Sequence, residues 1–244
     1  DSIYPDDLEY AERSLAEVLV KGAVEDREYR IIAADGQVRW LSDKCFINRQ
    51  DEPGQPVIIV GIAEDITEKK QMETELHRLA TTDVLTQSSN RRHFFECANR
   101  EFEVARVQGA QMAFLLLDID DFKMVNDTLG HAVGDKLLKR ISTKLSVRLR
   151  AEDKVYRLSG DEFVVLSLGN SRQEMAENLG QRIRAAIAEA IDYTCPDLPV
   201  SASVGVLQVL AFEDVSLEKL LARADQLMYQ AKKTGKNQVL VATL

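Results

Sequence analysis

The stretch YRLSGDEFVVL, residues 156–166, decides the fold of this chain. Apolar residues on both sides of Ser159 and Gly160 form the pattern of a β-hairpin with a tight turn. Two carboxylates, Asp161 and Glu162, follow the turn directly, which is more acid than turn formation requires. Taken alone, this pair is equally consistent with a solvated acidic turn and with a functional site.

A second stretch, residues 112–120, favours the functional interpretation. Its sequence MAFLLLDID predicts a strand that is buried on both faces and ends in acids. A buried strand that carries a carboxylate at its end is a common way for an α/β protein to present a metal ligand. Asp118 alone could instead cap a helix after the strand, but a second acid on the hairpin, Asp161, favours a metal site.

These residues and several others resemble the GGDEF family, the diguanylate cyclases. The signature is present as residues 159–163, with serine in place of the first glycine. The further matching blocks follow the order and spacing of the family between residues 80 and 241: Asp83–Thr86, Asn90–Arg92, Asp118–Asp127, Gly130–His131 with Gly134–Asp135, and Tyr229–Asn237. We therefore identify residues 83–244 as a GGDEF domain.

Helical and strand patterns alternate around the hairpin in this region. Helices are predicted from Asn90, over 136–150, from Ser171 and from Ser216 to a cap at Gly235, and strands over 111–118, 199–209 and 238–242. The pattern predicts the α/β (α+β) fold class, with helices packed on a mixed central sheet. The resemblance implies a palm-like sheet, similar to that of class III nucleotide cyclases.

Residues 1–66 have a different pattern. A helix is predicted over 3–21, followed by an antiparallel meander of strands over 27–33, 37–48 and 57–63. This segment resembles the C-terminal part of a PAS sensor domain. The first strands of that family, which supply much of its ligand pocket, are absent from the sequence, so we expect no bound haem or flavin. The alternative is a segment that only packs and dimerises.

Residues 67–82 are rich in charged side chains and carry Met72, Leu76 and Leu79 at heptad spacing. Barely two heptads cannot hold a dimer alone. One interpretation is a plain surface helix. The resemblance favours a signalling helix that pairs with its copy in a homodimer and sets the relative position of two downstream domains.

The composition limits the partners. With 244 residues, a net charge of -9 and a pI near 5.0, the chain is not expected to bind nucleic acid, which requires a cationic surface. No apolar run approaches the length of a membrane span, so we expect a cytoplasmic location without direct membrane contact in this part of the protein. The chain opens on Asp1, so a membrane tether could precede it. Three cysteines, Cys45, Cys97 and Cys195, lack metal or redox spacing and are expected to be buried and reduced.

The resemblance implies a cation site. Asp118, the Ile119 carbonyl and Asp161 match the metal ligands of the family, and Glu162 is expected to support or join them. Two Mg²⁺ ions per active site are implied, with Mn²⁺ as a possible substitute. Phosphoryl transfer mainly requires positioned phosphates and neutralised charge, which carboxylate-bound ions provide.

The resemblance also implies a GTP site. The backbone N–H groups at the start of a helix near residues 121–123 can receive a triphosphate. The residues that match the family's phosphate contacts, or lie beside the nucleotide, are Lys123, Lys232, Lys236, Phe122 and Gly160. Without the resemblance, the lysines at 232 and 236 could be simple charges at a helix C-terminus.

Guanine recognition is implied by Asn126 and Asp135, which match the guanine-binding pair of the family. A carboxylate suits the N1–H and N2–H₂ donors of guanine, and adenine has no such donors. Each residue has an ordinary alternative, because Asn126 could form a turn and Asp135 could cap a helix.

Two positions depart from the family pattern. Ser159 adds a Cβ and a hydroxyl where the signature has glycine, and lowered activity is the largest effect expected. Gln87 and Ser88 stand where Gly-Leu is usual, and this places local packing in question more than chemistry.

The expected activity is the condensation of two GTP molecules, one on each of two facing domains, into cyclic di-GMP and two pyrophosphates. Asp161, Glu162 and Lys123 are the expected catalytic residues. A degenerate domain that only binds cyclic di-GMP or GTP is the first alternative, and a single-substrate nucleotide cyclase is the second.

Feedback by the product is the last expectation. Arg150 and Asp153, expected at the end of the helix before the hairpin, match the family's inhibitory RxxD site, and Arg182 on the following helix lies near a position from which it could join them. An exposed ion pair is the ordinary alternative.

Overall fold

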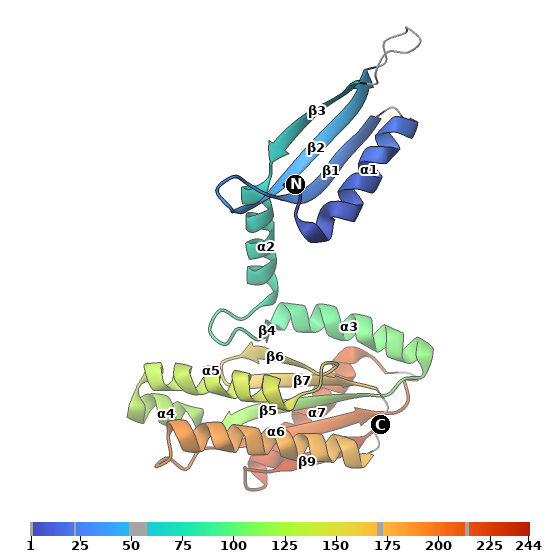
Figure 1. Ribbon diagram of the computed structural model, residues 1–244. Coiled ribbons are helices and arrows are strands. Elements are labelled where there is room, and N and C mark those ends of the chain that lie inside the picture. Colours follow the sequence, from blue (N-terminus) through green and yellow to red (C-terminus); the bar gives the residue numbers. More distant parts are fainter. Residues whose placement is uncertain (1, 22, 49–57, 170–172, 213–214) are drawn as a thin grey trace. The chain divides into compact units, whose positions relative to one another are not determined.

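A computed structural model describes residues 2–21, 23–48, 58–169, 173–212 and 215–244. The chain divides into two compact units, Asp1–His77 and Arg78–Leu244 (Figure 1). Each unit has its own sheet. None of the helices in the described ranges has the length and apolar character needed to cross a membrane.

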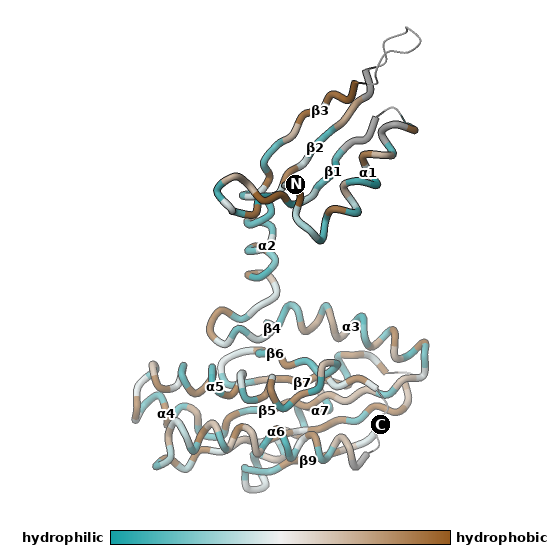
Figure 2. Tube along the Cα trace, in the orientation of Figure 1, coloured by the Kyte–Doolittle hydropathy of each residue, from teal (hydrophilic) through white to brown (hydrophobic). Residues whose placement is uncertain are grey.

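The first unit confirms the predicted order of a helix followed by an antiparallel meander. Its elements are the 3₁₀ turn η1 (Pro5–Asp7), α1 (Leu8–Lys21), β1 (Ala23–Ile32), β2 (Val38–Asn48) and β3 (Ile58–Asp65), with sheet order β1-β2-β3. Helix α1 packs on β1 and β2, where Arg27 makes a buried bidentate contact with Asp43 at 2.6 and 2.5 Å. Strand β3 is exposed along its whole length and is predominantly hydrophobic in its first half (Figure 2).

Helix α2 (Thr67–Thr81) follows β3, as the sequence predicts. The heptad residues Met72, Leu76 and Leu79 are 62%, 66% and 48% exposed in the single chain. The rest of the helix is mostly hydrophilic (Figure 2). This apolar stripe is therefore available to a second copy of the helix.

The second unit contains the predicted mixed sheet. Its strands are β4 (Ser89–Asn90), β5 (Met112–Asp120), β6 (Lys154–Ser159), β7 (Glu162–Leu168), β8 (Ser201–Val209) and β9 (Val239–Thr243), in the order β4-β6-β7-β5-β8-β9. The outer pairs β4–β6 and β8–β9 are parallel, and the inner pairs are antiparallel. Strand β5 is central and buried along its entire length, as expected from its sequence.

Helices cover both faces of this sheet (Figure 1). They are α3 (Arg91–Gln108), α4 (Phe122–Leu129), α5 (His131–Arg148), α6 (Gln173–Thr194) and α7 (Leu217–Lys233). The odd-numbered residues of β5 from Ala113 to Ile119 pack with α4, α5 and α6, and the even-numbered residues Met112 to Leu116 pack with α3 and α7. Because strand side chains alternate, Asp118 belongs to the α3 and α7 face.

Several predicted boundaries were wrong by a few residues. Strand β5 continues two residues beyond Asp118, and α5 covers 131–148 where 136–150 was predicted. The glycine predicted to end α7 does so, since Gly235 has φ +128° directly after the C-cap Thr234, and the next N–H, of Lys236, bonds to the Ala231 carbonyl. Asn90 and Ser216 are N-caps, as predicted. The predicted helix start at Ser171 lies outside the described residues.

Candidate active site

Two carboxylates lie opposite each other where β5 and β7 meet the hairpin turn. Asp118 and Glu162 are cross-strand partners in the antiparallel register. Both belong to the sheet face that α7 covers, and Lys232 of α7 places its Nζ atom 2.5 Å from Asp118 Oδ1. The contact is an ion pair between a partly exposed ammonium and a buried carboxylate. The side chain of Asp118 is thus buried with Lys232 as its counter-ion.

Burial raises the pKa of Asp118 to about 6, against the opposing effect of the Lys232 ammonium. The neighbouring charges of Asp161 and Glu162 raise this pKa further. Burial also raises the pKa of Asp161, with Glu162 contributing in the same direction. The three acids therefore lie close enough to repel one another, and the local positive charge does not compensate for them.

These acids fit a divalent cation that is shared with a substrate. The described residues contain no group of three or more His, Cys, Asp or Glu side chains arranged to hold an ion by themselves. Mg²⁺ usually binds one or two carboxylates and takes its other ligands from water and substrate phosphates. A buried carboxylate beside two further acids, with one ammonium nearby, matches that requirement.

Ile119 follows Asp118 on β5 and has its side chain buried on the opposite face of the sheet. Its cross-strand partner on β8 is Ala202. Strand β7 begins opposite Asp118, so Ile119 has no partner on β7. The backbone of Ile119 is therefore not committed to the ladder on the side where the hairpin acids lie.

Asp120 has a role that the sequence analysis missed. It is almost fully buried and accepts hydrogen bonds from Ser201 Oγ at 2.5 Å, Ser203 Oγ at 2.8 Å and the Asn237 backbone N–H at 3.1 Å. These contacts join β5 to β8 and to the loop after α7. Alternating serines in β8 are the signal that could have indicated a buried acceptor nearby.

Arg157 stabilises the turn of the hairpin by hydrogen bonds to its backbone. The guanidinium donates to the Gly160 carbonyl at 2.9 and 2.7 Å and to Asp83 Oδ1 at 2.9 Å. Gly160 has φ +45°, a left-handed conformation that glycine adopts without strain. One arginine thus fixes the turn that presents Asp161 and ties it to the loop after α2.

Ser159, the departure from the family signature, contacts Glu162 directly. Its hydroxyl donates to Glu162 Oε2 at 2.8 Å. The added side chain therefore orients a carboxylate of the site.

We expect Ser159→Ala to lower turnover about two- to tenfold, because the variant removes one hydrogen bond to a carboxylate and leaves the backbone unchanged. The Ser159→Thr variant, which keeps the hydroxyl, serves as the control in the same steady-state assay. Equal turnover of the alanine and wild-type proteins at limiting cation concentration would show that the contact has no role.

Lys236 lies in the loop beyond α7, which ends at Lys233. Its Nζ atom contacts both oxygens of Asp121 at 2.8 and 2.7 Å. Asp121 has φ +59° at the N-cap of α4 and makes no capping hydrogen bond with its side chain. The first N–H groups of α4, including those of Phe122 and Lys123, receive no side-chain cap from Asp121, and Lys123 is exposed beside them. The start of α4 has the properties of a phosphate site.

Asn126 and the start of α5 approach each other closely. A Cβ atom added to Gly134 would lie 2.1 Å from Asn126 Oδ1 and 3.2 Å from Phe122 Cζ. Asp135 follows Gly134 within the first turns of α5, so it is not a helix cap. The structure brings the predicted guanine pair into one neighbourhood between α4 and α5.

The loop with Gln87 and Ser88 keeps its turn despite the departure. Gln87 has φ +59°, which explains why a glycine would suit this position. Its side chain donates to the Val84 carbonyl at 2.7 Å, and Ser88 is buried against Thr86, with their hydroxyl oxygens 2.8 Å apart. Local hydrogen bonds therefore compensate for the missing glycine.

A pocket of about 190 Å³ contains the three predicted inhibitory-site residues. Arg150, Asp153 and Arg182 all line it, on the α6 side of the sheet. Arg150 and Asp153 lie in a turn after α5, and not at its end as predicted, and the Asp153 carboxylate accepts from the Arg150 backbone N–H at 3.2 Å. Arg182 donates to the Arg148 carbonyl. No ion pair joins Arg150 to Asp153 in this part of the described chain, so both side chains are available to a ligand.

The fold and these sites define an α/β protein with acids, an uncapped helix N-terminus and lysines at one end of a mixed sheet. A family model described as "Diguanylate cyclase, GGDEF domain" matches residues 80–238, and a PAS fold model matches residues 1–63. The chain belongs to the GGDEF family. All three cysteines are free and buried, as expected.

Two curated relatives come from Pseudomonas aeruginosa. Diguanylate cyclase DgcP is 39% identical over 165 residues, which are 67% of this chain and 24% of that protein. Cyclic di-GMP phosphodiesterase NbdA is 37% identical over 162 residues, which are 66% of this chain and 20% of that protein. The chain spans less than half the length of the curated relatives it matches.

A solved structure has the same fold. The chain resembles diguanylate cyclase SiaD, crystallised with its activator SiaC from Pseudomonas aeruginosa, with a TM-score of 0.60 and 29% identity. The match covers 72% of this chain and 66% of that one. The predicted palm-like mixed sheet is confirmed.

Proposed function

We propose that this chain is a diguanylate cyclase, which condenses two GTP molecules into cyclic di-GMP and two pyrophosphates. In each half of the reaction, a ribose 3′-oxygen bonds to the α-phosphorus of the other GTP, the bond to pyrophosphate breaks, and the hydroxyl proton passes to solvent. The observation that carries the proposal is the buried Asp118, paired across the strands with Glu162 and beside Lys232. Product analysis after incubation with GTP tests it.

The residues at the end of the sheet have distinct proposed roles. Asp118 and Asp161, with the Ile119 carbonyl, would hold two Mg²⁺ ions, or Mn²⁺ in their place, and Glu162 would support that site. Bound cations would neutralise the phosphates and orient the reacting oxygen. Asp118 is a buried carboxylate beside two further acids, and this surplus of negative charge supports the assignment.

The cationic side chains would bind the triphosphate. Lys232 and Lys236 are each paired with an acid, Asp118 and Asp121 respectively, and phosphate oxygens would replace those partners. Lys123 and the N–H groups at the start of α4, beside Phe122, would complete the phosphate site.

The base and the turn complete the nucleotide site. Asn126 and Asp135 would read the guanine edge, and their place between α4 and α5 supports this assignment. Gly160 lets the turn approach the nucleotide without a side chain. No side chain at the site is an obvious general base.

A binding module for GTP or cyclic di-GMP is the second candidate. Two observations favour it: Ser159 replaces a signature glycine, and one relative is named as a phosphodiesterase. Such a module would bind GTP without consuming it. Calorimetric GTP binding together with unchanged GTP after prolonged incubation would identify this case.

Catalysis is proposed to require a homodimer, because one domain holds one GTP and the product contains two. The domain boundaries that we propose are 1–66, 67–82 and 83–244, with the middle segment as the signalling helix. The first segment would regulate the enzyme by changing how two such helices pair. GTP is a cytoplasmic nucleotide, and we place the reaction there.

We expect specific activity to rise with protein concentration in the dilute range. Leu76→Glu should shift this rise to higher concentration, because it places a charge in the apolar stripe of α2. Gln71→Glu, also exposed on α2 but outside the stripe, is the matched control. A wild-type protein that is fully active as a monomer in sedimentation analysis contradicts the requirement.

Product feedback is proposed for the pocket lined by Arg150, Asp153 and Arg182. An arginine fork and a carboxylate suit the phosphates and guanine of cyclic di-GMP. Arg150→Ala should relieve product inhibition about fivefold or more while the initial velocity stays near the wild-type value. If the inhibition curves of the two proteins coincide, Arg150 is an ordinary surface residue and has no role in product feedback.

A further inference from the structure

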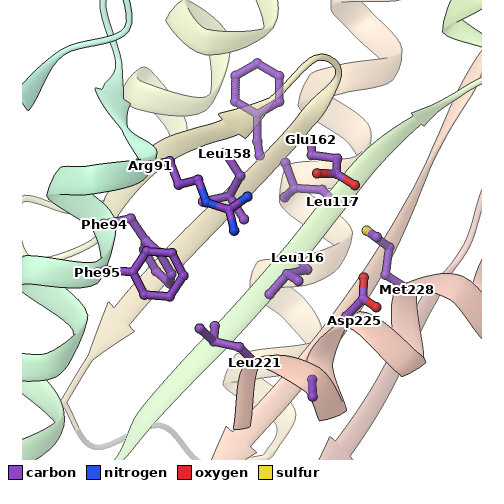
Figure 3. Close-up of a pocket in the computed structure, with 12 residues that line it drawn as sticks. Arg91, Phe94, Phe95, Leu116, Leu117, Leu158, Glu162, Leu221, Asp225 and Met228 are labelled. Atoms are coloured by element: carbon purple, nitrogen blue, oxygen red, sulfur yellow. The ribbon is translucent and has the colours of Figure 1, made fainter. Parts of the chain in front are cut away.

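A slot of about 220 Å³ lies between α3 and α7, on the face of the sheet opposite the inhibitory pocket. Figure 3 shows Phe94 and Phe95 on one side, Met228 and Leu221 on the other, and Leu116 of β5 as the floor. The walls are mostly apolar. The slot is therefore a site for the ring or hydrocarbon part of a ligand.

The slot exists because the helices on this face do not meet along their length. On the opposite face, α5 and α6 pack closely against each other, whereas α3 and α7 make few contacts. Leu158 and Leu221 are only half-buried as a result. The two leucines therefore line an open space between the helices.

The rim of the slot carries charges of both signs. Figure 3 shows the Arg91 guanidinium on the α3 side and the carboxylates of Asp225 and Glu162 across from it. Arg91 lies 5.6 Å from the centre of the Phe95 ring. Within the described ranges, neither Arg91 nor Asp225 takes part in an ion pair. A ligand carboxylate would find a partner in Arg91, and a ligand ammonium would find partners in the two acids.

We propose that this slot binds a small aromatic zwitterion, a molecule of the aromatic amino acid class. Its ring lies between the phenylalanines of α3 and Met228, its carboxylate contacts Arg91, and its ammonium contacts Asp225 and Glu162. A purely apolar ligand would make no contact with these charges. A ligand that is only an anion would leave the two acids without a partner, and one that is only a cation would leave Arg91 without a partner.

Occupancy of the slot acts on the hairpin. Leu158 and Glu162 both line it, and they bracket the turn that carries Asp161. An ammonium at Glu162 competes with the role of this acid at the neighbouring carboxylates, so the ligand lowers GTP turnover. This effect rests on the proposed function, whereas the binding itself does not.

Calorimetry with four probes tests the site: L-tryptophan, tryptamine, indole-3-acetate and indole. We expect saturable binding at one site per chain, tightest for L-tryptophan. Arg91→Gln should weaken binding of the two probes that carry a carboxylate about two- to fivefold and leave binding of tryptamine unchanged. Asp225→Asn should weaken the two probes that carry an ammonium by a similar factor and leave binding of indole-3-acetate unchanged. Arg92→Gln and Asp192→Asn, exposed charges outside the slot, are the matched controls.

Ala222→Trp should weaken every probe at least about tenfold, because the new ring fills the slot. Gln226→Trp, on α7 but outside the slot, should leave binding unchanged. If no probe binds saturably to the wild type, or if the two tryptophan variants bind alike, the proposal is wrong. If the probes bind but the protein does not turn over GTP, the proposed ligand site stands and the proposed function is wrong.

Discussion

Replacing Asp161 by asparagine is expected to lower GTP turnover by at least about 100-fold. Mutation of a residue that only hydrogen-bonds a metal ligand can already lower activity by about this factor. The variant keeps the size of the side chain and removes the charge that would hold a cation. Since Asp161 lies directly after the Gly160 turn, whose carbonyl Arg157 holds, the backbone of the hairpin should not change. The measurement is the steady-state rate at saturating GTP over a range of Mg²⁺ concentrations.

Stability gives the control for this variant. Burial raises the pKa of Asp161 above its ordinary value of 3.8, which it has in the unfolded chain. The folded protein therefore loses stability as the pH rises from 3.8 to the raised pKa. Asp118, with its pKa raised to about 6, has the same effect between pH 3.8 and 6. Without added cation, Asp161→Asn should therefore unfold at neutral pH at the same temperature as the wild type or higher. Turnover that recovers fully at high Mg²⁺ would remove Asp161 from the ligand set.

Gly134→Ala is expected to raise the KM for GTP about 10- to 100-fold, which corresponds to the free energy of one bidentate contact to a base. The new Cβ atom would lie 2.1 Å from Asn126 Oδ1, so the amide must leave its place. Alanine is a better helix former than glycine, and α5 should keep its structure. The measured quantities are KM and the dissociation constant of a non-hydrolysable GTP analogue.

A double-mutant cycle separates this effect from general damage. If Gly134→Ala acts through Asn126, adding it to Asn126→Ala should cost nothing further. Losses that simply add would place the effect elsewhere in the helix. An unchanged KM in Gly134→Ala would contradict the assignment of Asn126 to the base.

Two elements at the end of the sheet could be predicted from short stretches of sequence. The apolar run before Asp118 predicted a buried strand, and the turn at Ser159 and Gly160 predicted a hairpin with acids at its tip. The helix cap at Asn90 was equally local. Features of this kind depend on a few consecutive residues.

Features that depend on distant residues were not predicted. Asp120 bonds to serines more than 80 residues away, and Arg157 pairs with Asp83 across 74 positions. Helix ends are set by such tertiary contacts, so Arg150 was placed on a helix that ends at Arg148. The slot between α3 and α7 joins segments more than 100 residues apart, and no sequence pattern indicates it.

The central claim is tested most directly by incubating the purified chain, at a concentration that favours dimers, with GTP and Mg²⁺ and identifying the products by mass spectrometry. The account predicts cyclic di-GMP with two pyrophosphates for each molecule formed, and no product from ATP. Unchanged GTP at every protein concentration, or cyclic GMP as the product, would contradict it.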